Sequence, residues 1–383
     1  LLSTLLALAL LLAPAEAQNQ NLLIVLADDL GVDMVGAYGE GNDMPPTPTI
    51  DSLATSGVLF RNAWANPSCS PTRACTQTGR YPSRTYIGLW IDYPHDSFTR
   101  GTLNPAEVTI PEVLDMDGGT YAHGFIGKWH MSYASQGLGV PNEAGWSHYA
   151  GMLDGQVGSY TNYTQVVNGV AHNETTYLTT RQVDDAISWI QGQSEPWVCY
   201  LAFQAPHLPF HVPPANLHTQ NLAGVPITTS SRPHYKALIE AMDTELGRLF
   251  TTLGTTTMAN TNVVFMGDNG SVQNTAVAPF KGSKAKGSPY EGGLNVPLIF
   301  SGPAVVNPGR EVADLAGAVD IFPTVLALTD ALDSVPAWVE LDGVDLSPYL
   351  DETVTAPVRD HIYSEQFIGS SWPAPAIDGH ATI

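Results

Sequence analysis

Short apolar runs that end in polar side chains recur along this chain, and amphipathic stretches separate them. Between the runs, apolar side chains recur at helical spacing over residues 180–190 and 235–253. Strands that alternate with helices in this way predict an α/β/α sandwich around a central, largely parallel sheet. In such a sheet, ligands bind beyond the carboxyl ends of the strands. The strand-like runs are residues 22–27, 121–127, 197–203, 262–266 and 297–300.

The two ends of the chain differ from its middle. Residues 5–12 are purely apolar, and Ala15-Glu16-Ala17 offers a small-x-small cleavage site before Gln18. We therefore expect residues 1–17 to be an export signal and the protein to be secreted or periplasmic; the alternative is a buried N-terminal helix. The apolar run is too short to span a bilayer comfortably. At the other end, residues 359–367 look like a strand that enters further structure.

The charge balance is strongly acidic. The 383 residues include 37 Asp and Glu against 15 Lys and Arg. A surface with that excess repels phosphate backbones, so we expect no nucleic acid partner. The stretches 38–48 and 136–151 are rich in Gly, Pro and Asn and are predicted to be loops.

One short motif carries the strongest chemical signal. It is the segment Cys69-Ser70-Pro71-Thr72-Arg73, continued by Thr78-Gly79-Arg80. Proline fits the first turn of a helix, so Cys69 is predicted at a helix N-terminus, where the dipole favours an anion. Arg73 lies one turn further on and can reach the same spot. The motif predicts an anion held against a nucleophile; the alternative is a capped helix with a buried cysteine.

This motif is similar to the signature of the type I sulfatases, in the alkaline phosphatase superfamily, and the resemblance extends over residues 21–363. It implies an alkaline-phosphatase-like α/β/α sandwich and the hydrolysis of sulfate monoesters. In that family a formylglycine-generating enzyme oxidises the cysteine, and a hydroxyl of the hydrated aldehyde attacks sulfur. The resemblance thus implies that Cys69 becomes the nucleophile. Cys75 and Cys199 then remain, and two separate buried thiols are favoured over a disulfide.

Further motifs of the same family occur in order and imply a metal site. Asp28 and Asp29 follow the first strand, where two adjacent acids would repel without a cation. Asp268 and Asn269 follow residues 262–266 and resemble the second ligand pair of the family. With Cys69, these four residues are expected to bind Ca²⁺, with Mg²⁺ as the alternative, since hard cations prefer oxygen ligands.

The anion-binding groups also come from the resemblance. Lys128 and His130 stand in Gly-Lys-Trp-His, and His207 stands in Ala-Pro-His. Lys128 would bind a sulfate oxygen, His130 would contact the formylglycine hydroxyls and help to expel sulfate, and His207 would protonate the leaving alcohol. Lys286 matches the second sulfate-binding lysine, although Lys281 and Lys284 are close alternatives.

The charge of a sulfate ester gives these groups their expected roles. Its transition state loads charge onto oxygen, which Lys128, Lys286, Arg73 and the cation would stabilise. Asp268 could accept a proton as the hydrate attacks.

The chain departs from the family pattern at Asn295, where arginine is common, and it stops before most of the C-terminal subdomain. We therefore divide it into the signal at 1–17, a catalytic domain at 18–345 and the start of a truncated subdomain at 346–383.

Two other functions stay open at this point. One is a phosphodiesterase or phosphonate monoester hydrolase of the same superfamily, and the other is an inactive protein that binds sulfated glycans. The substrate is a sulfated carbohydrate or an aryl sulfate, and export favours a sulfated polysaccharide outside the cell. Residues 205–210 and 92–100 are candidates for shaping its pocket. Oligomeric state is not predicted.

Overall fold

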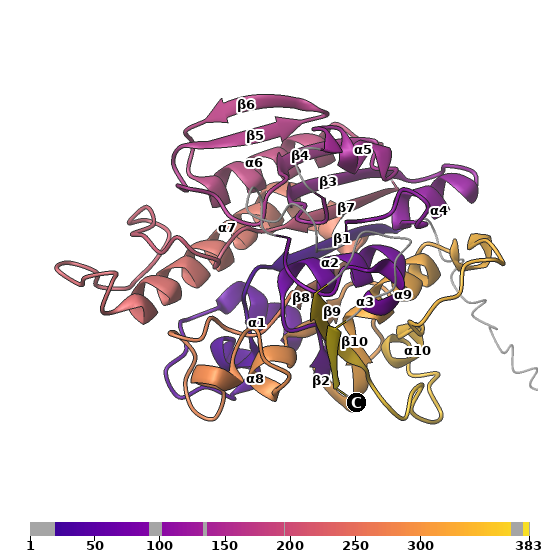
Figure 1. Cartoon of the computed structure of the whole chain (residues 1–383). Helices are drawn as coiled ribbons and strands as arrows, with labels where there is room; N and C mark the ends of the chain where they lie inside the picture. Colours follow the sequence, from indigo (N-terminus) through magenta and orange to yellow (C-terminus); the bar gives the residue numbers. More distant parts are fainter. Residues whose placement is uncertain (1–19, 92–101, 133–135, 195, 369–377, 383) are drawn as a thin grey trace, which may run out of the picture.

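The computed structural model describes residues 20–91, 102–132, 136–194, 196–368 and 378–382. It confirms an α/β/α sandwich in which helices cover both faces of one large sheet (Figure 1). The expected export signal at 1–17 and the loop at 92–100 lie outside the described residues.

The large sheet has ten strands in the order β10-β2-β9-β8-β1-β7-β3-β4-β5-β6. Its central strands, β8, β1, β7, β3 and β4, are parallel to one another, whereas β9, β5 and β6 run antiparallel to their neighbours. This confirms the largely parallel sheet. The strands are β1 Asn21–Ala27, β2 Gly57–Trp64, β3 Ala122–Lys128, β4 His148–Met152, β5 Tyr163–Val167, β6 Val170–Glu174, β7 Trp197–Ala202, β8 Thr261–Gly267, β9 Leu298–Ser301 and β10 Arg310–Gly317.

Alternation of side chains along the central strands builds two apolar cores. In β1, Leu22, Ile24 and Leu26 pack with the helices α2, α4 and α9, whereas Leu23 and Val25 pack on the other face with α1, α6 and α7. The helices are α1 Pro48–Thr55, α2 Cys69–Thr78, α3 Pro82–Thr85, α4 Ile110–Met116, α5 Val140–Glu143, α6 Leu178–Gln191, α7 Ser231–Ala259, α8 Glu291–Leu294, α9 Ile321–Leu328 and α10 Ser347–Leu350. Short 3₁₀ turns occupy Val32–Met34, Gly36–Tyr38, Gly282–Lys284, Ala318–Asp320 and Leu332–Ser334.

Both predicted helices are confirmed, as α6 and α7, and each of the five strands predicted for the central sheet lies within two residues of its expected bounds. The loop predicted at 136–151 is wrong in part, because it contains α5 and most of β4. In β4, Gly151 serves close packing rather than a turn: a Cβ there would lie 1.8 Å from the carbonyl oxygen of Gly127. Within the described residues, no helix is long and apolar enough to cross a membrane.

A separate antiparallel hairpin stands near the C-terminus. It pairs β11 Ser364–Ile368 with β12 Asp378–Thr382, so the strand expected over 359–367 begins later than predicted. The backbone N–H of Phe367 donates to the carbonyl of Gly88, which fixes β11 beside the segment that follows α3.

All three cysteines are buried and free, which confirms separate thiols at Cys75 and Cys199.

Candidate active site

Helix α2 presents Cys69 at its first turn, as the sequence predicts. Ser68 is the N-cap residue, and the whole helix is buried. Arg73 lies one turn further on, with only 1% of its surface exposed, and its Nη1 donates to the backbone carbonyl of Lys128 at 2.8 Å. Cysteine and arginine therefore face the same edge of the sheet.

The register of β1 and β8 brings the four expected metal-binding residues together. Ala27 pairs with Gly267, so the residues after each strand lie side by side. The N–H of Asp29 donates to Asp268 Oδ1 at 2.9 Å, and Asn269 Nδ2 donates to Asp29 Oδ1 at 2.8 Å. Asp29 has a φ of 69°, a left-handed conformation that is unusual for a residue other than glycine.

Three cations surround these carboxylates. Lys128, at the end of β3, places Nζ 2.5 Å from Asp28 Oδ2. Arg73 donates to Asp268 Oδ2 at 2.8 Å. Lys286 forms an ion pair with Asp29 and places its Nζ 3.4 Å from Cys69 Sγ. The choice of Lys286 over its neighbours Lys281 and Lys284 thus agrees with its position beside the cysteine.

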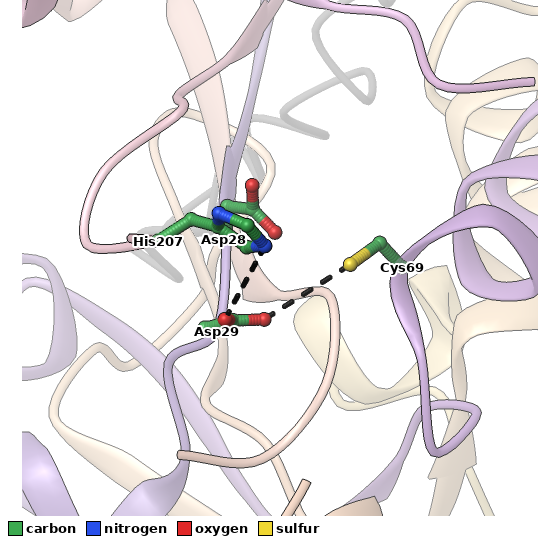
Figure 2. Close-up of side chains that lie close together, drawn as sticks. All are labelled: Asp28, Asp29, Cys69 and His207. Atoms are coloured by element: carbon green, nitrogen blue, oxygen red, sulfur yellow. Dashed lines mark hydrogen bonds and ion pairs between the residues drawn. The ribbon is translucent and has the colours of Figure 1, made fainter. Parts of the chain in front are cut away.

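Figure 2 shows how Cys69 and His207 approach Asp29 from two sides. Cys69 Sγ lies 4.0 Å from Asp29 Oδ1, and His207 Nε2 lies 3.8 Å from Asp29 Oδ2. The other ring nitrogen of His207 lies 2.8 Å from the carbonyl oxygen of Leu208. Burial lowers the pKa of His207 to about 3, although the charge of Asp29 opposes that shift. His130 faces the same pocket, with its Nε2 2.8 Å from the carbonyl oxygen of Ile91, and its expected contact with residue 69 stays a prediction.

The buried oxygens fit a hard divalent cation. Asp28 Oδ1, Asp29 Oδ2 and Asn269 Oδ1 are buried and have no hydrogen-bond partner within the described part of the chain. Such oxygens are costly unless something binds them. One donor atom each from Asp28, Asp29, Cys69 and His207 also lies within 4.8 Å of the others. By contrast, both oxygens of Asp268 already accept hydrogen bonds, from Asp29 and Arg73.

Burial and neighbouring charges shift the pKa values of the acidic groups in this cluster in different directions. Burial raises the pKa of Asp29, but the charges of Lys286 and the other nearby cations outweigh it and hold the pKa below its usual range. Burial, followed by the charge of Asp28, raises the pKa of Asp268 to about 7. Burial also raises the pKa of the Cys69 thiol, which therefore stays protonated and is a poor nucleophile at neutral pH.

A pocket of about 640 Å³ opens above this cluster. We call its lower wall the floor, formed by Asp29, Cys69, His130, His207 and Lys286. We call its outer wall the rim, formed by Trp90, Asp154, Gln156, Gln273, Asn274 and Gln366.

Sequence reasoning missed the rim and two supports of the floor. Gln204 is fully buried, and its Nε2 lies 3.4 Å from Asp28 Oδ2 and 3.2 Å from the carbonyl oxygen of Gly155. Tyr235 donates its hydroxyl to the backbone carbonyl of Asp29. Gln204 is the second residue after β7, so the rule that ligands bind at strand ends could have identified it. The rim residues carry no motif.

Known proteins resemble this chain over most of its length. A sequence profile described as Sulfatase matches residues 20–331. Arylsulfatase A of Bos taurus is 32% identical over 377 residues, which cover 92% of this chain and 72% of that protein. N-acetylgalactosamine-6-sulfatase of Sus scrofa is 29% identical over 364 residues, which cover 86% of this chain and 66% of that protein.

The fold is similar as well. The crystal structure of Ps i-CgsB in complex with k-i-k-neocarrahexaose matches with a TM-score of 0.77 and 29% sequence identity. The match covers 91% of this chain and 80% of that one. The mostly parallel sheet flanked by helices is therefore the alkaline-phosphatase-like fold of these structural neighbours.

Proposed function

The chain belongs to the sulfatase family, and on that premise we propose that it hydrolyses sulfate monoesters with an oxidised Cys69 and a bound divalent cation. Its relatives are named sulfatases, so it is an enzyme of the sulfuric ester hydrolase class. Neither a phosphodiesterase nor an inactive glycan-binding protein is favoured by these relatives.

The position of Cys69 carries the proposal. Its Sγ is 3.4 Å from Lys286 Nζ and 4.0 Å from Asp29 Oδ1, at the floor of the pocket. Because the buried thiol stays protonated, it could not attack an ester efficiently. Oxidised to formylglycine, this side chain would supply a hydrated aldehyde whose hydroxyl serves as the nucleophile.

We assign the surrounding charges to the sulfate and its leaving group. Lys286 reaches the pocket surface, with 20% of its side chain exposed, so it would bind a sulfate oxygen directly. Lys128 and Arg73 are almost wholly buried and would hold Asp28 and Asp268 in place while adding positive charge beneath the anion.

Three further groups would move protons. His207 would give a proton to the leaving alcohol, because its Nε2 lies at the pocket floor; the charge of the bound sulfate would have to raise its pKa, which burial lowers in the empty site. His130 would take a proton from residue 69 as sulfate departs. Asp268 would accept a proton during the attack.

The cation would be held by Asp28, Asp29, Asp268, Asn269 and residue 69. We propose Ca²⁺, with Mg²⁺ as the alternative, because the unpaired buried oxygens form a hard donor set. A bound cation would act as a Lewis acid on the sulfate.

The wider setting is also a proposal. The substrate class would be sulfated glycans outside the cell, reached through the export signal at residues 1–17. A formylglycine-generating enzyme would be a partner during maturation. Residues 18–345 would form the catalytic domain, and residues 346–383 would begin a C-terminal subdomain.

Mass spectrometry tests this proposal independently of turnover. The protein is produced with and without a formylglycine-generating enzyme, and the peptide that contains residue 69 is weighed. With the enzyme, we expect a mass roughly 18 Da lower than that of the cysteine form and sulfate release from an ester. Full activity in protein that retains the thiol would contradict the proposed nucleophile.

A further inference from the structure

The rim of the pocket is built from amide side chains of three distant segments. Gln156 follows β4, Gln273 and Asn274 follow β8, and Gln366 belongs to β11. Each primary amide both donates and accepts hydrogen bonds, as a sugar hydroxyl does. The ring of Trp90, 39% exposed on the same rim, adds an apolar face against which C–H groups of a sugar can pack.

The hairpin near the C-terminus aims Gln366 at the pocket. On one side of β11, Glu365 accepts a hydrogen bond from Ser83 Oγ at 2.7 Å, and its backbone N–H donates to Asn66 Oδ1 at 3.2 Å. Side chains alternate along a strand, so Gln366 points away from Glu365. The anchored strand therefore places Gln366 in the wall of the pocket.

Within the described lining of the pocket, positive charge is confined to the floor. Among the described residues that line the pocket, Lys286 is the single lysine or arginine, and Asp29 and Cys69 already engage it. The rim carries the carboxylate of Asp154, which is exposed to the pocket and has no ion pair or hydrogen bond within the described part of the chain. A second anion on the substrate would meet this carboxylate without a cation to balance it.

We propose that the rim selects a neutral sugar ring that carries one sulfate, and that Asp154 excludes rings with a second sulfate or a carboxylate. The amides of Gln156, Asn274 and Gln366 bind the ring hydroxyls, and the floor takes the sulfate. Unpaired like charges are an effective way to reject a competing ligand. This inference rests on the proposed function and names the substrate class of that same site.

The test compares three kinds of ester on the formylglycine-bearing protein. These are hexose monosulfates with sulfate at each position, the corresponding hexose disulfates, and 4-nitrophenyl sulfate. We expect kcat/KM for the best monosulfate to exceed that for its disulfate by about tenfold or more. In Asp154→Asn, that ratio should fall about tenfold.

A second variant tests the amides. In Gln366→Ala, the ratio of kcat/KM on the monosulfate to that on 4-nitrophenyl sulfate should fall about tenfold, mainly through KM, since the lost hydrogen bond is to the sugar. Gln191→Ala and Asp333→Asn are matched controls, because both residues are exposed and lie outside the pocket lining. Both ratios should stay at their wild-type values in the controls.

The outcomes separate this inference from the proposed function. Wild-type protein that cleaves disulfates as well as monosulfates overturns the inference and leaves the sulfatase assignment intact. The inference is also overturned, with the sulfatase assignment intact, by either of two other results. One is an unchanged ratio of kcat/KM on monosulfate to that on disulfate in Asp154→Asn, and the other is cleavage of 4-nitrophenyl sulfate but of no hexose sulfate. If protein with modified residue 69 cleaves none of the esters, the proposed function itself fails and this inference fails with it.

Discussion

At the floor of the pocket and directly beneath it, the charged side chains pair with one another, whereas the rim side chains stand largely open to solvent. Asp28 and Lys128 are fully buried 2.5 Å apart, and Arg73 ties Asp268 to the backbone of β3. Gln156 and Asn274 on the rim are exposed, and no such contact with the rest of the described chain holds their amides.

This difference in contacts suggests a division of roles, with catalysis at the floor and substrate selectivity at the rim. The floor residues contact one another and the buried charges beneath them, so a change there disturbs charges that depend on one another. The rim residues come from loops and a hairpin, and each could change without altering the floor. On the proposed function, the floor would determine that a sulfate is cleaved, and the rim would determine which sulfate.

The largest expected effect is the loss of the nucleophile. Cys69→Ala should lower kcat by at least about 10⁴-fold on every ester, as expected when a covalent nucleophile is removed. Rates on an aryl and a sugar sulfate check this, with circular dichroism as the control for folding. Activity within tenfold of wild type would show that the floor works without residue 69.

Chelation should have the next largest effect. Removing the cation should slow turnover by about 10³-fold, because several kcal/mol of charge stabilisation are lost. The melting temperature should also fall, since a ligand present at 100 times its Kd stabilises the fold by about 2.7 kcal/mol. Titration with Ca²⁺ and then Mg²⁺ identifies the preferred ion. A chelated sample that keeps both its activity and its melting temperature would rule out the metal site.

The losses of activity in Lys128→Ala and His207→Ala should depend differently on the leaving group. Losing the charge of Lys128 should slow all esters similarly, by about 10²-fold. Losing His207 should cost about 10²-fold more on sugar sulfates than on nitrophenyl sulfate, because a sugar alkoxide needs a proton to leave. The measurement is kcat/KM for both variants on both esters. Equal deficits on the two leaving groups would make His207 an anion-binding residue instead of an acid.

The smallest expected effect is on stability. It is tested with one kind of substitution, glutamine to alanine, beneath the floor and at the rim. Gln204→Ala at the floor removes donors from Asp28 and from the Gly155 carbonyl, which should cost about 1–3 kcal/mol and lower the melting temperature by a few degrees. Gln156→Ala at the exposed rim should change stability by less than about 0.5 kcal/mol. Thermal melts of both variants beside wild type check this. Equal shifts would mean that the rim is as integrated as the floor.

Much of the fold could be predicted because local patterns and tertiary packing agree. The apolar run 22–27 is a central strand whose side chains enter the cores on both faces of the sheet. The apolar side chains spaced along 235–253 pack against one of these faces. Strand β4 was missed because it lies in a glycine-rich stretch that resembles a loop, and only the close approach of Gly151 to Gly127 explains the glycine within the strand. Which strands are antiparallel was also not readable, since pairing joins residues far apart in sequence.

For the active site, the sequence by itself predicted which motif residues come together. Cys69, Asp28 and Asp29 after β1, Asp268 and Asn269 after β8, and Lys128 occur as short motifs, and each lies at or just beyond an end of a regular element that positions it. The tertiary structure alone decided that Lys286 reaches Cys69 and that Gln204 supports Asp28. It alone decided the rim too, because exposed amides on loops and a hairpin leave no periodic pattern and become neighbours only when the chain folds.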